Sequence, residues 1–267
     1  MKIATWNING VRARIENLVA WLKESQPDIV CLQEIKTVDE AFPRAEIEAL
    51  GYNVETHGQK GFNGVALLSK LPFDEVNRRL AGDDSDEHSR FIEGVFSVQD
   101  PKAGRKALRV VSLYLPNGNP IGTEKFTYKL AWMARLERWA QERLTLEEPL
   151  VLAGDYNVIP TPIDARYPEN WTSDALFQPE SRAAHRRLRA LGFTDAHRAV
   201  DDSPGIYTFW DYQAGAWQKN NGIRIDHLML SPEAANRLTA ATVEKHVRAW
   251  EKPSDHVPAI AHLAFTA

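Results

Sequence analysis

The chain has a single cysteine among its 267 residues, so it cannot form an internal disulfide. It also lacks a positively charged N-terminal start followed by an apolar run, and no apolar stretch is long enough to cross a bilayer. These absences argue against a secreted or membrane-embedded protein, and we expect a reducing, cytoplasmic location. Low-complexity linkers and short repeats are also missing, so we expect one domain over residues 1–267.

An excess of positive charge is missing too. The 32 lysines and arginines stand against 36 aspartates and glutamates, which gives a formal net charge of −4. Such a balance does not by itself indicate a nucleic-acid partner, so a DNA-binding face would have to come from local basic residues. The dense run 182–189 is one such cluster, with a solvated helix face as its other explanation. Single candidates for phosphate contacts are Arg12, Arg14, Lys60, Lys125, Lys129 and Lys219.

Apolar periodicity predicts an alternation of strands and helices. The segments with helical spacing or composition are 15–25, 42–50, 123–144 and 181–191. The strand-like runs are 2–7, 28–33, 52–56, 64–69, 91–99, 108–114, 150–154, 207–212, 224–231, 242–246 and 259–265. Several connections in the middle are too short for helical crossovers, which predicts antiparallel hairpins there. The pattern predicts an α/β (α+β) fold in which two packed sheets are covered by helices.

Polar side chains gather where the strand-like runs stop. The segments that carry them are 6–10, 32–34, 154–157, 224–227 and 253–256. Each segment alone has an ordinary explanation as a turn, a helix cap or the solvated end of a strand. Together, strands that end in carboxylates and amides can converge at one edge, where hard oxygen ligands suit Mg²⁺ or Mn²⁺. No Cys/His spacing supports a zinc site.

Six motifs occur in a fixed order: WNING at 6–10, LQE at 32–34, YLPNG at 114–118, GDYN at 154–157, RIDH at 224–227 and SDH at 254–256. In this order and spacing they resemble the bacterial exonuclease III type of apurinic/apyrimidinic endonuclease, within the endonuclease/exonuclease/phosphatase superfamily. The resemblance extends from residue 2 to residue 265. It implies a four-layered α/β sandwich, with two mixed β-sheets face to face and helices outside.

The resemblance implies a Mg²⁺ site, with Mn²⁺ as a substitute ion. Glu34 is the implied main ligand, with Asn7 and Asp255 near the ion. The full implied set of residues around the metal is Asn7, Glu34, Asp155, Asn157, Asp255 and His256. Without a cation, these carboxylates would repel one another strongly.

Catalytic roles are implied in the same way. Asp155 would orient or deprotonate the attacking water, and Asn157 would hold Asp155 or the phosphate. His256, oriented by Asp255, would donate to a phosphate oxygen. The remaining implied catalytic residues are Tyr114, on the phosphate or the leaving oxygen, and Asp226, as a supporting carboxylate.

Substrate contacts are implied at four positions. Phe209 would form the wall of a pocket for a flipped-out abasic sugar, and Ile223 would line the same pocket. A flat apolar wall suits a deoxyribose that has no base edge to read. The aromatic run 207–212 also fits a packed strand, in which about half of the rings face the core. Asn117 and Arg224 complete the implied substrate-binding set.

The implied function is a Mg²⁺-dependent DNA phosphodiesterase of base excision repair. It would cut double-stranded DNA 5′ of abasic sites and trim blocked 3′ ends as a 3′–5′ exonuclease and phosphatase, acting as a monomer. One alternative is an exonuclease and 3′-phosphatase with weak abasic-site activity. Another is a phosphoinositide or sphingomyelin phosphodiesterase, which would carry membrane-facing apolar loops. A non-enzymatic scaffold would have lost a metal-binding or water-activating group, and none is missing.

Overall fold

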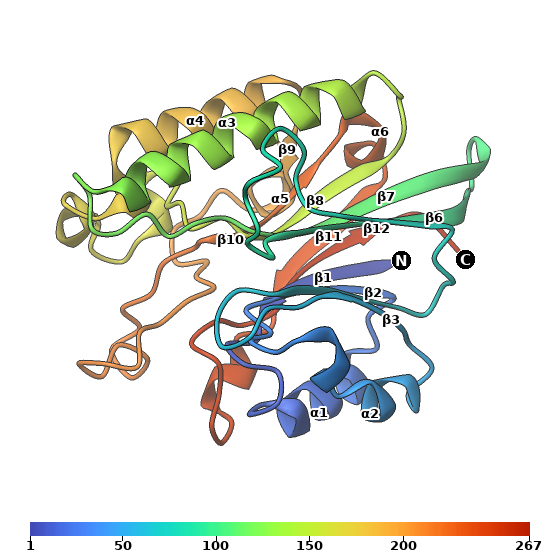
Figure 1. Ribbon diagram of the computed structural model, residues 1–267, viewed down its shortest axis with the longest axis horizontal. Helices are drawn as coiled ribbons and strands as arrows, with labels where there is room; N and C mark the ends of the chain where they lie inside the picture. The colour runs from blue at the N-terminus through green and yellow to red at the C-terminus, as the bar shows by residue number, and fades with distance from the viewer.

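Two six-stranded sheets lie face to face in the computed structural model, which describes residues 1–267 (Figure 1). The first sheet has the order β11-β12-β1-β2-β4-β3. Its strands are β1 (Lys2–Asn7), β2 (Ile29–Gln33), β3 (Asn53–His57), β4 (Val65–Ser69), β11 (Leu238–Val243) and β12 (Ala259–Leu263). The second sheet has the order β5-β6-β7-β8-β10-β9. Its strands are β5 (Glu75–Arg78), β6 (Phe91–Asp100), β7 (Gly104–Tyr114), β8 (Leu150–Asp155), β9 (Thr194–Asp195) and β10 (Asp226–Leu230).

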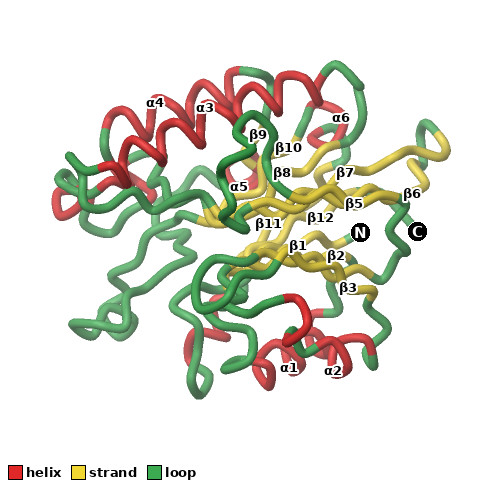
Figure 2. The backbone as a smooth tube through the Cα atoms, viewed as in Figure 1, coloured by secondary structure: helices red, strands yellow, loops and turns green.

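Helices cover the outer face of each sheet, as the tube view shows (Figure 2). Below the first sheet lie α1 (Ile15–Ser25) and α2 (Arg44–Glu48), and above the second lie α3 (Glu124–Leu144) and α4 (Pro179–Ala190). The shorter helices are α5 (Ala196–Val200) and α6 (Pro232–Ala235). Single 3₁₀ turns occupy Asp39–Ala41, Pro162–Asp164, Pro168–Trp171, Ala175–Phe177 and Lys245–Ala249. No helix combines the length and the apolar character that a membrane crossing requires.

The core is divided among the layers. A cluster of 21 buried residues fills the space between the sheets, including Ile3, Cys31 and Phe96. A second cluster joins the first sheet to α1 through Trp6 and Trp21, whose rings meet edge to face. Central strands such as β2 are buried on both faces, which explains their continuous apolar sequence. The predicted four-layered sandwich is therefore confirmed.

Both sheets are mixed, and their parallel pairs direct the polar strand ends to the same side. β1 runs parallel to β2, and β7 runs parallel to β8. The predicted hairpins in the middle are present as the antiparallel pairs β3–β4 and β6–β7. Gly154 permits the close approach of β7 and β8, because a Cβ there would lie 1.9 Å from the carbonyl oxygen of Leu113. Long loops gather at the end of the sandwich opposite the two termini (Figure 2).

Three predicted strands differ in the structure. The segment 207–212 is not a strand and makes only isolated bridges at Phe209, to Ile223 and His256. The strand predicted over 224–231 begins later, at Asp226, because the Arg224 amide donates to the carbonyl of Asp164 instead of a neighbouring strand. The strand predicted over 242–246 lies earlier, as β11, where pairing with β12 sets its length.

Candidate active site

Two carboxylates face each other across the β8–β10 pair. Asp155 and Asp226 are register partners in this antiparallel ladder, and both are almost completely buried. Like charges in directly opposite positions repel each other. The imidazole of His256 offsets this repulsion, since its Nδ1 lies 2.8 Å from Asp226 Oδ2 and its Nε2 lies 3.6 Å from Asp155 Oδ2. The three side chains form one buried acid–imidazole–acid cluster.

The orienting partner of His256 is Asp226, which corrects the prediction that Asp255 would hold the ring. The Asp255 carboxylate instead accepts a hydrogen bond from Asn9 Nδ2 at 3.3 Å. The ring of Phe209 packs edge to face on the other side of His256, with centroids 5.0 Å apart. The imidazole is thereby fixed by both charge and packing.

The first sheet contributes Asn7 and Glu34, from the ends of the parallel strands β1 and β2. The Asn7 amide donates to Glu34 Oε1 and to Asp155 Oδ2, each at 2.9 Å, and so joins the two sheets at the site. Glu34 has a left-handed backbone conformation with φ of 48°. A non-glycine residue held there is strained, and such strain concentrates at functional sites. Lys36 Nζ lies 3.2 Å from the other Glu34 oxygen.

Burial and neighbouring charges shift the pKa values of this cluster strongly. Burial, with Asp226 nearby, raises the pKa of Asp155 to about 7 although His256 opposes the shift. Burial disfavours the imidazolium of His256, but the carboxylates of Asp226 and Asp155 outweigh it and raise the His256 pKa to about 10. For Glu34, burial is outweighed by the Asn7 hydrogen bond and the Lys36 charge, which lower the pKa. Hence His256 is cationic at neutral pH, and Asp155 can gain or lose a proton there.

A pocket of about 300 Å³ opens onto this cluster. Eight of the predicted site residues line it: Glu34, Tyr114, Asn117, Asp155, Asn157, Phe209, Asp255 and His256. Asn7 and Asp226 lie just behind that lining and are fully buried. Burial and the nearby carboxylates of Glu34 and Asp155 raise the pKa of Tyr114 well above its ordinary value, so its hydroxyl remains a donor.

Five further residues line the pocket without having been predicted: Trp171, Asp174, Leu176, Asp211 and Ile225. Only Trp171 carried a signal, as an aromatic residue in a loop between two predicted elements. The others come from loops whose path depends on tertiary contacts.

Two of the implied substrate contacts lie away from the pocket. Ile223 is 1% exposed and packs in a small apolar cluster, while Ile225 takes the place at the wall. Arg224 is also 1% exposed, and its guanidinium pairs with Asp164 at 2.7 Å and with Asp195 at 2.8 Å. A buried guanidinium saturated by two carboxylates cannot contact substrate, so that prediction is wrong.

The carboxylates of the site suit a hard cation. Asp155, Asp226 and His256 each offer one atom within 4.8 Å of the others, a spacing that can hold a metal ion. His256 lies close enough to share an ion with Asp155 and Asp226, and its role as a metal ligand stays a prediction. Asp226 Oδ1 is buried without a hydrogen-bond partner, and such an acceptor is costly unless positive charge is close. Carboxylate and amide oxygens are the ligands that Mg²⁺ and Mn²⁺ prefer.

The sequence profile of the endonuclease/exonuclease/phosphatase family matches residues 4–256. The chain belongs to this family. Within the family, it is 36% identical to exodeoxyribonuclease III of Haemophilus influenzae over 266 residues, which cover 97% of this chain and 98% of that protein. It is 32% identical to the DNA repair nuclease APEX1 of Danio rerio over 271 residues, covering 99% and 82% of the two chains.

Solved structures of the family have the same fold. An AP endonuclease from Archaeoglobus fulgidus superposes with a TM-score of 0.91 at 36% identity, covering 98% of this chain and 99% of that one. The 3′ phosphatase NExo from Neisseria, bound to a product DNA hairpin, superposes with a TM-score of 0.92 at 34% identity and the same coverage. The predicted exonuclease III type is confirmed, and with it the enzyme class of a hydrolytic nuclease.

Proposed function

We propose that this chain hydrolyses phosphodiester bonds of double-stranded DNA in the pocket above Asp155. It would cut 5′ of abasic sites and remove blocking groups from 3′ ends. One observation carries the proposal: Asp155, at the end of β8, accepts a hydrogen bond from Asn7 of the first sheet and lies beside His256, which precedes β12, and all of this lies at an acidic pocket. The names of similar proteins, an exodeoxyribonuclease III, an AP endonuclease and a 3′ phosphatase, support DNA as the substrate.

Asp155 is proposed as the general base for the attacking water. A pKa of about 7 leaves enough carboxylate to accept a proton at neutral pH while keeping it basic enough to do so. Its second oxygen accepts a hydrogen bond from the backbone N–H of Asn157 at 2.9 Å, which fixes the direction of the carboxylate. A positioned base alone increases the reaction rate only about 10²–10⁴-fold, whereas whole enzymes increase it roughly 10⁶-fold or more. Other groups must therefore stabilise the charge that develops on the phosphate.

His256 and Tyr114 are proposed to supply part of that charge stabilisation. The imidazolium is held positive by Asp226, and its Nε2–H is directed toward the side of the pocket where Asp155 lies. Tyr114 keeps its proton and offers a hydroxyl donor from the end of β7. Fixed donors in a buried site stabilise developing negative charge without reorganising during the reaction.

Glu34 is proposed to hold Mg²⁺ or Mn²⁺, with Asn7, Asp155, Asn157, Asp255 and His256 nearby. When bound, the cation supplies positive charge that stabilises the phosphoryl oxygens and activates water. The chain itself provides the excess of carboxylate charge that attracts the ion, and it orients Glu34 through Asn7 and Lys36.

The apolar side of the pocket is proposed to receive a baseless sugar. Leu176 and Ile225 line the pocket and belong to one small apolar cluster, against which the lining residues Phe209 and Trp171 pack. A nucleotide that enters such a pocket must leave the duplex stack, which costs least when no base has to be unstacked. The pocket therefore favours an abasic deoxyribose or a frayed 3′ end over an intact nucleotide.

We further propose that residues 1–267 act as one domain and as a monomer. The 21 buried residues between the sheets would be exposed if the sheets separated. Sedimentation equilibrium is expected to give a single species near the chain mass of 30.2 kDa, and a tight dimer would contradict this.

Incubation of the pure protein with a duplex that carries one abasic-site analogue, with Mg²⁺ or with EDTA, tests the proposed function. Incision immediately 5′ of the site, leaving a 3′-hydroxyl and abolished by EDTA, is the expected result. Shortened 3′ ends without incision would leave an exonuclease and 3′-phosphatase as the function. If neither product forms, DNA is the wrong substrate, and phosphoinositide and sphingomyelin assays follow.

A further inference from the structure

Lys129 is a buried ammonium group without a carboxylate partner. It lies on the 21-residue helix α3, and its side chain is 0% exposed. Burial lowers the pKa of Lys129 to about 7, although Asp155 and Asp174 oppose the shift. A buried charge that lacks an ion pair is expensive, so the interactions that retain it need an explanation. This placement also corrects the prediction that Lys129 contacts a DNA phosphate directly.

The hydrogen bonds of Lys129 go to the backbone of two pocket loops. Its Nζ donates to the carbonyl oxygen of Asn117 at 3.1 Å and to the carbonyl oxygen of Asn157. Asn117 follows β7, and Asn157 follows β8, which is parallel to β7. One ammonium group therefore ties together the loops at the ends of two neighbouring strands.

Both tied residues line the pocket. The Asn117 amide donates to Asn157 Oδ1 at 3.4 Å, and the Asn157 amide donates to the carbonyl of Leu115 at 2.7 Å. Asn157 has a left-handed backbone conformation with φ of 46°. Such a conformation needs surrounding interactions to maintain it, and the bond from Lys129 to the Asn157 carbonyl is one of them.

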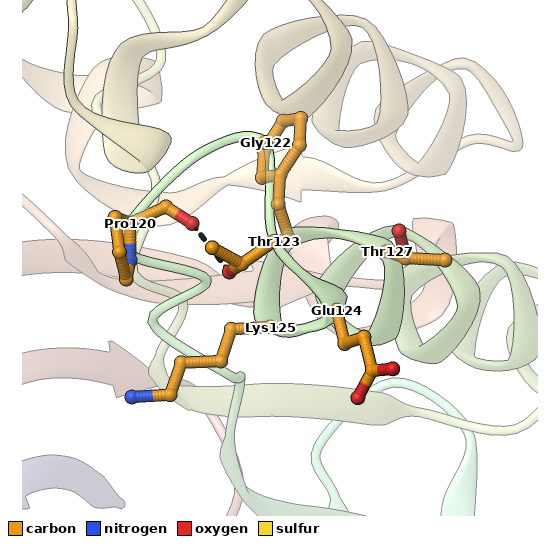
Figure 3. Close-up of a pocket in the computed structure, with 7 residues that line it drawn as sticks. Pro120, Gly122, Thr123, Glu124, Lys125 and Thr127 are labelled. Carbon is orange, nitrogen blue, oxygen red and sulfur yellow. Dashed lines mark hydrogen bonds between the residues drawn. The ribbon is translucent and has the colours of Figure 1, made fainter.

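The loop lies directly against the stem of Lys129. A Cβ at Gly118 would lie 2.6 Å from Lys129 Cδ and 3.1 Å from its Cβ, and the glycine has φ of +84°. Only glycine allows this contact. By contrast, Lys125 lies in the first turn of α3 and extends into an open surface pocket (Figure 3). Lys129 is thus enclosed by the loop that it holds.

We propose that Lys129 is a positioning residue for phosphodiester hydrolysis, which locks the Asn117 and Asn157 loops so that their amides face the substrate. It acts through these loops and does not touch the substrate. The proposal rests on the proposed function of the pocket, because the two amides can contribute to hydrolysis only when a phosphate is bound there. Loss of such a supporting contact commonly lowers activity by about 10–100-fold.

The test compares Lys129→Met, which keeps the length of the side chain but removes its donors, with Arg138→Met, which removes an exposed charge from the same helix. Lys129→Met is expected to lower kcat on the abasic duplex about 10–100-fold, with the DNA Kd within about threefold. Arg138→Met is expected to retain normal kcat. In an Asn157→Ala background, Lys129→Met should have little further effect on kcat, because both changes remove the same positioned amide. Additive effects would contradict the proposal.

Hydrogen exchange provides a second readout that needs no substrate. Amides of residues 115–119 and 155–159 should exchange faster in Lys129→Met than in Arg138→Met. If Lys129→Met folds poorly, Gly118→Ala displaces the same loop from the same side chain and should reproduce the kcat loss. Unchanged exchange together with normal kcat in either variant overturns the proposal. If the wild-type protein leaves DNA uncut, the proposed function fails, and exchange alone then decides the role of Lys129.

Discussion

Two clusters of buried charge lie on opposite faces of β10. Asp226 points between the sheets and meets His256 beside Asp155, whereas the next residue, His227, points toward the helices and contacts Arg224 at 3.1 Å. The catalytic cluster opens into a pocket, contains an unpartnered carboxylate oxygen, and has more carboxylates than cations. The second cluster is largely buried, with only Arg198 partly exposed, and its charges are balanced.

The balance of the second cluster follows from its partners. Arg224 and Arg198 stand against Asp164 and Asp195, with every pair between 2.6 and 2.8 Å. Burial opposes the ionised carboxylate of Asp195, but the charge and hydrogen bonds of Arg224 outweigh it and lower the Asp195 pKa. A cluster whose positive and negative charges balance needs no bound ion, whereas an excess of buried carboxylates favours the binding of a cation. The comparison separates a structural cluster from a catalytic one by charge balance and access, and not by residue type.

Removal of Arg224 should break the balanced cluster and produce the largest effect. Arg224→Met leaves Asp164 and Asp195 buried with too little positive charge, and we expect a loss of about 3–5 kcal/mol in the free energy of unfolding. Urea denaturation measures this loss. The exposed pair of Arg187 and Glu137 provides the control, since Arg187→Met should cost less than about 1 kcal/mol. A catalytic defect in Arg224→Met without loss of stability would erase the distinction between the clusters.

Removal of His256 from the catalytic cluster should lower the rate of hydrolysis more than it lowers the stability of the fold. In His256→Asn, the donor to the phosphate is lost, and we expect kcat to fall about 10²–10³-fold. Single-turnover incision of the abasic duplex by the folded variant gives this rate. A variant that retains wild-type turnover would show that the imidazolium only separates two carboxylates.

Trp171 tests the apolar side of the pocket. Trp171→Ala removes a wall contact to the sugar, so abasic-site incision should fall about tenfold, whereas removal of a 3′-phosphate should change less than about twofold. The two reactions, measured on one preparation, control for each other. Equal losses in both would place Trp171 in a general contact with DNA.

His227 gives the smallest effect, in the dependence of stability on pH. Burial and Arg224 lower the pKa of His227 to about 3, so the folded protein keeps it neutral. The unfolded chain takes up a proton below about pH 6.5, and stability should therefore fall as pH decreases through this window. His227→Asn should flatten this slope by about 1 kcal/mol per pH unit, as measured by urea unfolding from pH 7 to pH 4. The exposed His88, changed to Asn, should leave the slope unchanged.

The sequence predicted the catalytic residues better than their partners. Asn7, Glu34 and Asp155 end apolar strands, and parallel pairing directs such ends to one edge. The partner of His256 could not be predicted in this way, because Asp226 is 30 positions away in the sequence and only tertiary packing brings the two side chains together. The resemblance implied Asp255 as the partner, whereas the structure shows Asp226 in that place.

The buried position of Lys129 could have been predicted from the sequence. Its spacing from Trp132, Met133 and Leu136 places it on the buried stripe of α3, although its charge suggested an exposed contact to DNA. Arg224 was misplaced because Arg224 and Asp226, both in the RIDH motif, were assigned to one site. Arg224 precedes β10, which begins at Asp226, and its guanidinium lies with His227 in the balanced cluster.

The role of Asp155 is the central claim, and Asp155→Asn tests it most directly. The substitution keeps the shape of the side chain and removes the base. We predict that single-turnover incision of the abasic duplex in Mg²⁺ falls about 10²–10⁴-fold, while the Kd for the same duplex stays within about threefold of wild type. Near-normal incision by a folded Asp155→Asn protein that binds DNA normally would contradict the account.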